Sequence, residues 1–179
     1  MKNEFSNYFL RPLIPTDALV LHASIIENQE RLKRYFPVTL SSNSTIEKTK
    51  KYISAKSEEI VEKVNFTFAI KENNSHQIAG LIILKKIDWV KKQGEFAYCI
   101  GSQFEGKGIT SIAVREMTKF AFAELGLNTL QIIAHKSNLG SVKVALNNGF
   151  TWQRTLKNEF TPKDELPLDM ELYELYNEK

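Results

Sequence analysis

Cysteine is nearly absent from this chain, in which Cys99 is the single cysteine among 179 residues. One cysteine cannot form a disulfide within the chain, which fits a reducing compartment. The first ten residues lack the apolar run of a signal peptide, and the longest apolar stretches, such as residues 78–84, are far too short to cross a bilayer. We therefore expect a cytoplasmic protein with no membrane partner.

A large excess of charge of either sign is also missing. The net charge is +3, and charged residues make up 25% and hydrophobic residues 42% of the chain, as in ordinary globular proteins. This balance is too weakly basic to indicate a nucleic-acid partner. His22, His76 and His135 show no metal-ligand spacing, so we expect no metal. The length suits a single domain over residues 1–179.

Hydrophobic periodicity and turn residues predict alternating strands and helices. Residues 65–71 alternate between apolar and polar, as in a half-buried strand, whereas residues 77–87 are nearly all apolar, as in a central strand. Pro37 is expected to end a helix and to lead into a polar loop over residues 41–44. The expected order is strand 5–13, helices 18–26, 28–36 and 45–63, strands 65–71, 77–87 and 95–100, helix 110–125, strand 129–134, helix 141–148, and two late strands, from 150 and over 168–176.

The strand–helix–strand unit over residues 95–134 must place its two strands parallel, whereas the consecutive strands before it can form an antiparallel meander. We therefore expect an α/β fold with a mixed, mostly antiparallel sheet and helices on its faces.

The segment over residues 100–111 joins a predicted strand to the strongest predicted helix. Gly106 and Gly108 let its backbone turn tightly and approach a ligand closely. The first turn of a helix has N–H groups without internal partners and a positive potential, which together suit a phosphate or pyrophosphate. On these residues alone, an ordinary glycine-containing loop explains the pattern equally well. The dinucleotide fingerprint, the P-loop and the kinase motifs are absent.

Residues 104–110 resemble the pyrophosphate loop of the GNAT superfamily, the Gcn5-related N-acetyltransferases. The usual pattern is Gln or Arg, two residues, Gly, any residue, then Gly or Ala. Glu105 and Thr110 stand at its first and last positions and depart from it. Gln103 to Gly108 match it literally two residues upstream, where the helix start would be misplaced. Further segments resemble the RimJ/RimL-type branch of this family: 10–13, 28–37, 94–100, 127–128, 138–141 and 149–150.

The resemblance implies a GNAT fold, in which the central parallel strands 95–100 and 129–134 splay apart to hold acetyl-CoA. The pantetheine arm would pair with backbone groups near the end of the first strand, loop N–H groups would take the pyrophosphate, and Asn138 would bond the pantetheine or the loop. No metal or covalent intermediate is needed. The implied cofactor-binding residues are Tyr98, Cys99, Ile100, Gly106, Lys107, Gly108, Ile109, Thr110, Ser111 and Asn138.

Two residues are candidates for catalysis. Glu95 would accept the proton of the amine, through a water; alternatively it faces solvent or pairs with a nearby lysine. Many relatives carry a tyrosine acid where this chain has Ala145, so Ser141 is the replacement candidate; alternatively it is a helix-start serine. Cys99 has no histidine nearby in the sequence and is expected to be a buried small residue rather than a nucleophile.

The resemblance implies an acetyl-CoA-dependent N-acetyltransferase that works by direct attack of a primary amine. The expected acceptor is the N-terminal α-amine of a ribosomal or other protein. Two alternatives stay open: acetylation of a small amine such as an antibiotic, a polyamine or an amino acid, and a non-catalytic acyl-CoA-binding module. Relatives often dimerise, which leaves room for a homodimer.

Overall fold

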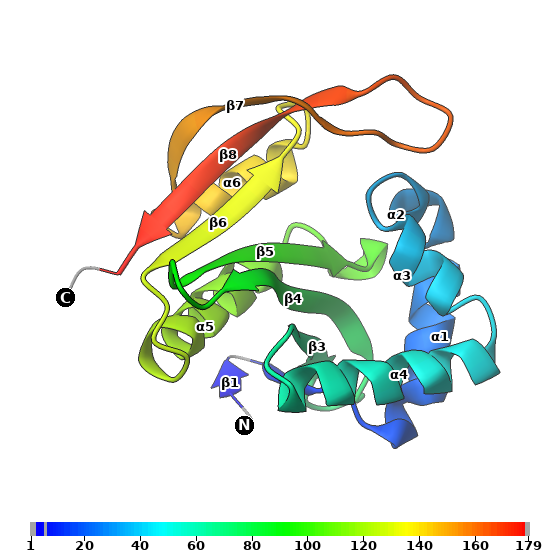
Figure 1. Ribbon diagram of the computed structural model, residues 1–179. Helices are drawn as coiled ribbons and strands as arrows, with labels where there is room; N and C mark the ends of the chain where they lie inside the picture. Colours follow the sequence, from blue (N-terminus) through cyan, green and yellow to red (C-terminus); the bar gives the residue numbers. More distant parts are fainter. Residues whose placement is uncertain (1–2, 6, 178–179) are drawn as a thin grey trace. The chain divides into compact units, whose positions relative to one another are not determined.

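The structure is a computed structural model that describes residues 3–5 and 7–177 (Figure 1). Contacts along the chain divide it into two compact units, and strands β4 and β5 each run from one unit into the other. Unit 1 comprises the residues up to Ile83 and Tyr98–Ile109, and unit 2 comprises Leu84–Ala97 and the residues from Thr110 onward. The single domain predicted over residues 1–179 stays a prediction, and its ends, residues 1–2 and 178–179, lie outside the described part.

Unit 1 combines one edge of the sheet with most of the helices. Its strands follow the order β1-β2-β3-β4, and β2 pairs antiparallel with both β1 and β3. Helices α1 to α4, blue to cyan in Figure 1, pack on one another. The elements are β1 (Asn3–Phe5), β2 (Tyr8–Pro12), η1 (Pro15–Asp17), α1 (Ala18–Glu27), α2 (Gln29–Tyr35), α3 (Pro37–Ser42), α4 (Ile46–Val61), β3 (Phe66–Glu72), the start of β4 (Ile78–Asp88), the end of β5 (Gln93–Ile100) and η2 (Ser102–Phe104).

Three expectations for unit 1 need correction. The strand expected over residues 5–13 is two strands, β1 and β2; Ser6 lies outside the described residues. Pro37 ends α2 as predicted, but it also begins α3, because the first helical position needs no N–H donor. Residues 41–42 are therefore helical, not part of a loop. Strand β3 was expected to be half-buried, yet its polar residues Thr67 and Lys71 are buried as well.

Lys71 can be buried because it meets Asp17, whose side chain is 2% exposed. Lys71 Nζ lies 2.7 Å from one carboxylate oxygen, Arg11 donates two bonds of 2.7 and 2.8 Å, and the Ile14 N–H adds one of 3.0 Å. Burial raises the pKa of Asp17, but the bonds from Arg11, Lys71 and Ile14 outweigh burial and hold it below the usual value. This cluster joins β2, β3 and the entry to α1.

Unit 2 contains the other edge of the sheet. Its strands follow the order β4-β5-β6-β8-β7, and Figure 1 shows β6, β8 and β7 side by side, with α6 behind them. Strands β5 and β6 are parallel, with Gln93 opposite Thr129 and Phe96 opposite Ile132, whereas β8 pairs antiparallel with β6 and β7. The further elements are α5 (Ile109–Ala123), β6 (Thr129–Ala134), α6 (Leu139–Asn147), β7 (Thr151–Phe160) and β8 (Leu168–Tyr176).

The predicted α/β fold with a mixed sheet is therefore confirmed, including the parallel pair that the strand–helix–strand unit required. β6 and β8 have the predicted bounds, while α6 begins two residues before the predicted start at Ser141. Among the described residues, no helix has the length and apolar character needed to span a membrane.

Candidate active site

The loop between β5 and α5 has a backbone that glycine makes accessible. Gly106 and Gly108 have φ angles of +72° and +71°, and a Cβ at either position would meet no heavy atom within 4 Å. Glycine is thus favoured here by conformation and not by crowding. Residues 105–108 are exposed and lead directly into α5, which begins at Ile109. The predicted combination of a glycine loop with the N-terminus of a helix is therefore present.

Side chains of unit 1 contact residues of this loop. Phe104 is 5% exposed and meets Tyr8 edge-on, with 6.3 Å between the ring centroids. Lys107 Nζ lies 5.5 Å from the centroid of the Phe104 ring. Glu105, at the first position of the resembled motif, pairs with Arg31 on α2. The negative charge of Glu105 is thus paired with the positive charge of Arg31.

The end of β5 carries the predicted pantetheine contacts Tyr98, Cys99 and Ile100, all half-buried. Burial raises the pKa of the Cys99 thiol to about 11, although a hydrogen bond with the Leu81 backbone acts in the other direction. A thiol that stays protonated near neutral pH is a poor nucleophile, in agreement with the reading of Cys99 as a small packing residue. Gly80 approaches this strand closely, because a Cβ there would lie 2.2 Å from the Cys99 carbonyl oxygen.

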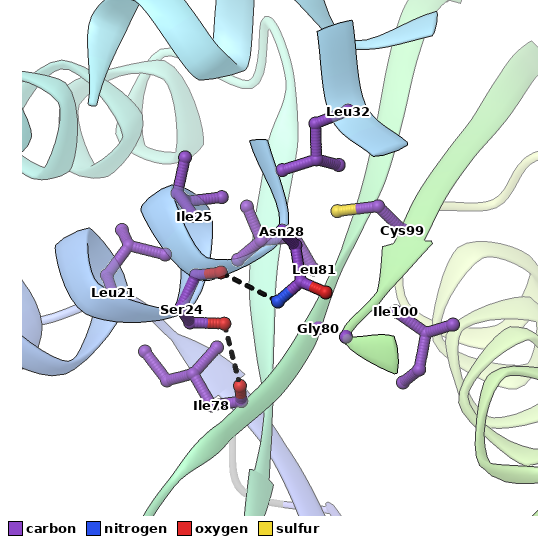
Figure 2. A pocket seen from close by; sticks show the side chains of 11 residues that line it. Leu21, Ser24, Ile25, Asn28, Leu32, Ile78, Gly80, Leu81, Cys99 and Ile100 are labelled. Atoms are coloured by element: carbon purple, nitrogen blue, oxygen red, sulfur yellow. Dashed lines mark hydrogen bonds between the residues drawn. The ribbon is translucent and has the colours of Figure 1, made fainter. Parts of the chain in front are cut away.

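A small cavity lies between α1, α2, β4 and the end of β5 in unit 1 (Figure 2). Its volume is about 10 Å³, room for one group the size of a water molecule. Most of its lining is apolar, and the two polar side chains, Ser24 and Asn28, both make hydrogen bonds to the protein. The cavity therefore offers no carboxylate to a cationic ligand.

Glu95 lies on the part of β5 that belongs to unit 2 and is 7% exposed. Its two carboxylate oxygens lie 2.9 Å from Lys85 Nζ and 2.9 Å from Lys86 Nζ. The hydrogen bond to Glu95 is the main cause of the raised pKa of Lys86. The lysine pairing that the sequence left open is thus present, and a base role requires a water or amine to compete with two ammonium groups.

The turn between β6 and α6 contains Asn138 and Ser141. The side-chain oxygen of Asn138 accepts a bond of 3.2 Å from the Ser141 N–H, which makes Asn138 the N-cap of α6. Ser141 lies in the first helical turn, as the structural alternative for it predicted. Ala145, where many relatives carry a tyrosine acid, is fully buried.

Asn148 is a residue that the sequence analysis missed. Its side-chain amide donates bonds of 2.9 Å to Ser111 Oγ and 2.8 Å to the Val144 carbonyl, and so joins the end of α6 to the beginning of α5. Within unit 2, this contact brings the predicted phosphate-loop residue Ser111 next to the helix that carries Ser141. An asparagine directly before the Gly149-Phe150 pair was the available sequence signal.

An open groove of about 500 Å³ begins directly before the Asn138 turn, in unit 2. Lys157 and Asp169, both in its lining, form an ion pair of 2.6 Å, and Asp169 also accepts a bond of 3.0 Å from the Asn158 N–H. These two interactions, the Lys157 hydrogen bond foremost, lower the pKa of Asp169. The groove is lined by His135, Lys136, Thr155, Lys157, Asn158 and Asp169, among others.

Comparisons with known proteins identify the class. Residues 7–151 match the acetyltransferase (GNAT) domain family. A Bacillus subtilis protein described as "Putative ribosomal N-acetyltransferase YdaF" is 34% identical over 143 residues, which cover 79% of this chain and 76% of that protein. The chain therefore belongs to the GNAT family, as its loop and flanking segments predicted, and it is an acetyl-CoA-dependent N-acetyltransferase.

Solved structures agree on the fold. The ribosomal-protein-S5-alanine acetyltransferase from Vibrio fischeri matches with a TM-score of 0.92 at 23% identity, covering 100% of this chain and 98% of that one. The RimL ribosomal L7/L12 alpha-N-protein acetyltransferase, in complex with coenzyme A, matches with a TM-score of 0.88 at 19% identity, covering 98% of both chains.

Proposed function

We propose that the acceptor is the N-terminal α-amine of a protein, with ribosomal proteins as the first candidates. The supporting observation is the 34% identity, over most of both chains, to a relative described as a ribosomal N-acetyltransferase. An α-amine suits this chemistry, because its ordinary pKa of about 7.7–8.0 leaves a substantial neutral fraction near neutral pH. A lysine side chain or a polyamine is protonated far more completely and needs more help.

The donor, acetyl-CoA, is proposed to place its pyrophosphate on the N–H groups of the loop and of the first turn of α5. The positive φ angles of Gly106 and Gly108 and the exposure of residues 105–108 support this placement. The pantetheine arm would run along the end of β5, where a backbone N–H near Ile100 would polarise the thioester carbonyl. The residues proposed to contact the donor are Tyr98, Cys99, Ile100, Gly106, Lys107, Gly108, Ile109, Thr110, Ser111 and Asn138.

The proposed reaction is one direct displacement. The neutral amine attacks the thioester carbon, a C–N bond forms, the C–S bond breaks, and CoA leaves as the thiolate. The proton lost by the amine passes through water to Glu95. This residue is buried on β5, the strand along whose end the pantetheine arm is proposed to run. Ser141, in the first turn of α6, is the proposed proton source for the thiolate, although a CoA thiolate is a tolerable leaving group without it.

The groove beside the Asn138 turn is a suitable place for the acceptor chain. Its carboxylates are already engaged, Asp169 by Lys157 and Glu171 by the hydroxyl of Thr155 at 3.0 Å. Lys136 adds a positive charge. This lining favours a peptide over a polyamine, which needs unpaired carboxylates for its several ammonium groups.

A comparison of matched acceptors tests this proposal. Purified protein and acetyl-CoA are incubated with a peptide that has a free N-terminus and blocked lysines, with the same peptide N-terminally blocked and its lysines free, and with spermidine. We expect mass spectrometry to find an added acetyl group on the α-amine of the first peptide at the highest rate. Preferential acetylation of spermidine or lysine would contradict the acceptor assignment, and CoA binding without any turnover would favour a non-catalytic module.

Three broader features belong to the same proposal. A ribosomal-protein acceptor places the enzyme in the cytoplasm, a homodimer is the expected assembly, and residues 1–179 are expected to fold as a single domain. Light scattering on the purified chain tests the dimer, and a single cooperative unfolding transition is the expected sign of one domain. A monomer, or two separate transitions, would contradict the corresponding part.

A further inference from the structure

Asn28 connects the junction between α1 and α2 to the loop that leads to α5, all within unit 1. Its side-chain amide donates a bond of 2.9 Å to the Ser24 carbonyl at the end of α1. Its side-chain oxygen accepts a bond of 2.9 Å from the Ser102 N–H, the first residue of η2. Asn28 is 5% exposed, so both bonds are shielded from water. Figure 2 shows its amide between α1 and the strand that carries Cys99 and Ile100.

The Asn28 contact adds to the backbone bonds of this part of the loop, one of which runs from the Glu105 N–H to the Ser102 carbonyl at 3.3 Å. The Gly101 N–H bonds to the Ala79 carbonyl at 2.8 Å, and the Phe104 N–H bonds back to Gly101 at 2.9 Å. Between them, the Ser102 N–H is bonded to a side chain that is 74 residues away in the sequence. Gly101 fits closely beneath that side chain, since a Cβ at Gly101 would lie 3.4 Å from the Asn28 amide nitrogen.

We infer that Asn28 is a positioning residue that holds the phosphate loop in its donor-binding conformation. A loop with two positive-φ glycines has many alternative conformations, and each of them reduces the fraction of molecules ready to bind. Fixing the base of the loop at Ser102 raises this fraction before the donor arrives, which is preorganisation. This inference rests on the proposed placement of the CoA pyrophosphate on the loop.

Asn28→Ala is the first variant to measure, by titration of coenzyme A into the purified protein and by steady-state kinetics. Loss of the bond to Ser102 is expected to weaken CoA binding about tenfold and to raise the KM for acetyl-CoA by a similar factor. The kcat at saturating donor should stay within about twofold, because a bound donor restores the loop. A purely structural role would lower the melting temperature and the active fraction while leaving the affinity unchanged.

Ser24→Ala is the matched control. Ser24 lies one helical turn before Asn28, lines the same cavity, and bonds the Ile78 carbonyl at 3.2 Å without contacting the loop (Figure 2). It is expected to lower stability without changing CoA affinity.

Ser102→Pro keeps the inference testable even if Asn28→Ala folds poorly. It removes the N–H from which Asn28 accepts, and its ring takes the place of that hydrogen and displaces the Asn28 side chain. The backbone at this position tolerates proline because it opens a helical turn after Gly101 at φ −65° and ψ 147°. We expect it to weaken CoA binding at least as much as Asn28→Ala. Combining the two should add no further loss, because alanine at position 28 leaves room for the ring.

The outcomes separate two failures. A wild-type protein that does not bind CoA would contradict the proposed function. A wild-type protein that binds CoA, with unchanged affinity in both Asn28→Ala and Ser102→Pro, would leave the proposed function standing and overturn the inference. Fully additive losses in the double variant would also overturn it, because the two groups would then act independently.

Discussion

Gly108→Glu is the substitution that should damage donor binding most selectively. At φ +71° any residue with a Cβ is strained by about 1–2 kcal/mol, while open space around the position means that no clash adds to this. A carboxylate about 5 Å from one pyrophosphate charge adds a repulsion of about 3 kcal/mol at an effective dielectric constant of about 20. The sum corresponds to a loss of CoA affinity of at least about a thousandfold.

Gly108→Ala separates these two contributions, because it introduces the strain without the charge. Isothermal titration with coenzyme A should show a loss of about tenfold for the alanine variant and no measurable binding for the glutamate variant. Added salt should narrow the difference between them, since it screens the repulsion at this exposed loop. Circular dichroism should show that both variants fold. Wild-type affinity in the folded glutamate variant would refute the reasoning.

Three further predictions concern single side chains. Glu95→Gln should lower kcat/KM about a hundredfold at pH 7. The loss should shrink above pH 8, because most of the α-amine is then neutral without a base. A loss of kcat/KM that is constant across pH would contradict the base role. Cys99→Ala should keep activity within about threefold, because the thiol, with its pKa of about 11, stays protonated; abolished turnover would contradict this. Asp17→Asn should lower the free energy of unfolding by about 3–5 kcal/mol in urea titrations, because Lys71 is left buried without its counter-charge. Since the pKa of Asp17 is lowered in the folded protein, this stabilisation of the wild-type protein should be present at neutral pH and fade as the pH falls below about 4. A free energy of unfolding that does not change with pH in that range would contradict the prediction.

Local patterns predicted most of the strands and the strongest helices. β6 and β8 have the bounds expected from their apolar residues, and the parallel pairing of β5 with β6 followed from the single helix between them. Helix α3 was missed, because Pro37 is equally compatible with ending one helix and with beginning the next. Local sequence cannot distinguish these two roles of proline.

Long-range contacts explain the remaining differences. Lys71 reads as an exposed strand residue until Asp17, 54 residues earlier, supplies its counter-charge. Asn28 belongs to a segment that resembles the family, yet its bond to the Ser102 N–H spans 74 residues and leaves no pattern in the sequence. The side-chain oxygen of Asn138, a residue that we propose to contact the donor, also caps α6, a role that needs only the three residues that follow it.

The lysine contacts of Glu95 show how far the sequence could predict the candidate active site. Lys85 and Lys86 lie about ten residues before Glu95, across the turn between β4 and β5, so the sequence could name a nearby lysine as partner. It could not decide between that pairing and a free carboxylate, because the answer depends on how two strands align. The same alignment brings Gly80 against the Cys99 carbonyl, a contact with no local signature.

The most direct measurement follows the backbone N–H groups of the loop by nuclear magnetic resonance while coenzyme A is added. The account predicts large, saturable shifts for the amides of Gly106, Gly108, Ile109 and Thr110, and weak shifts when pantetheine, which lacks the diphosphate, replaces coenzyme A. Binding of coenzyme A that leaves these four amides unmoved would contradict the placement of the diphosphate on which the account depends.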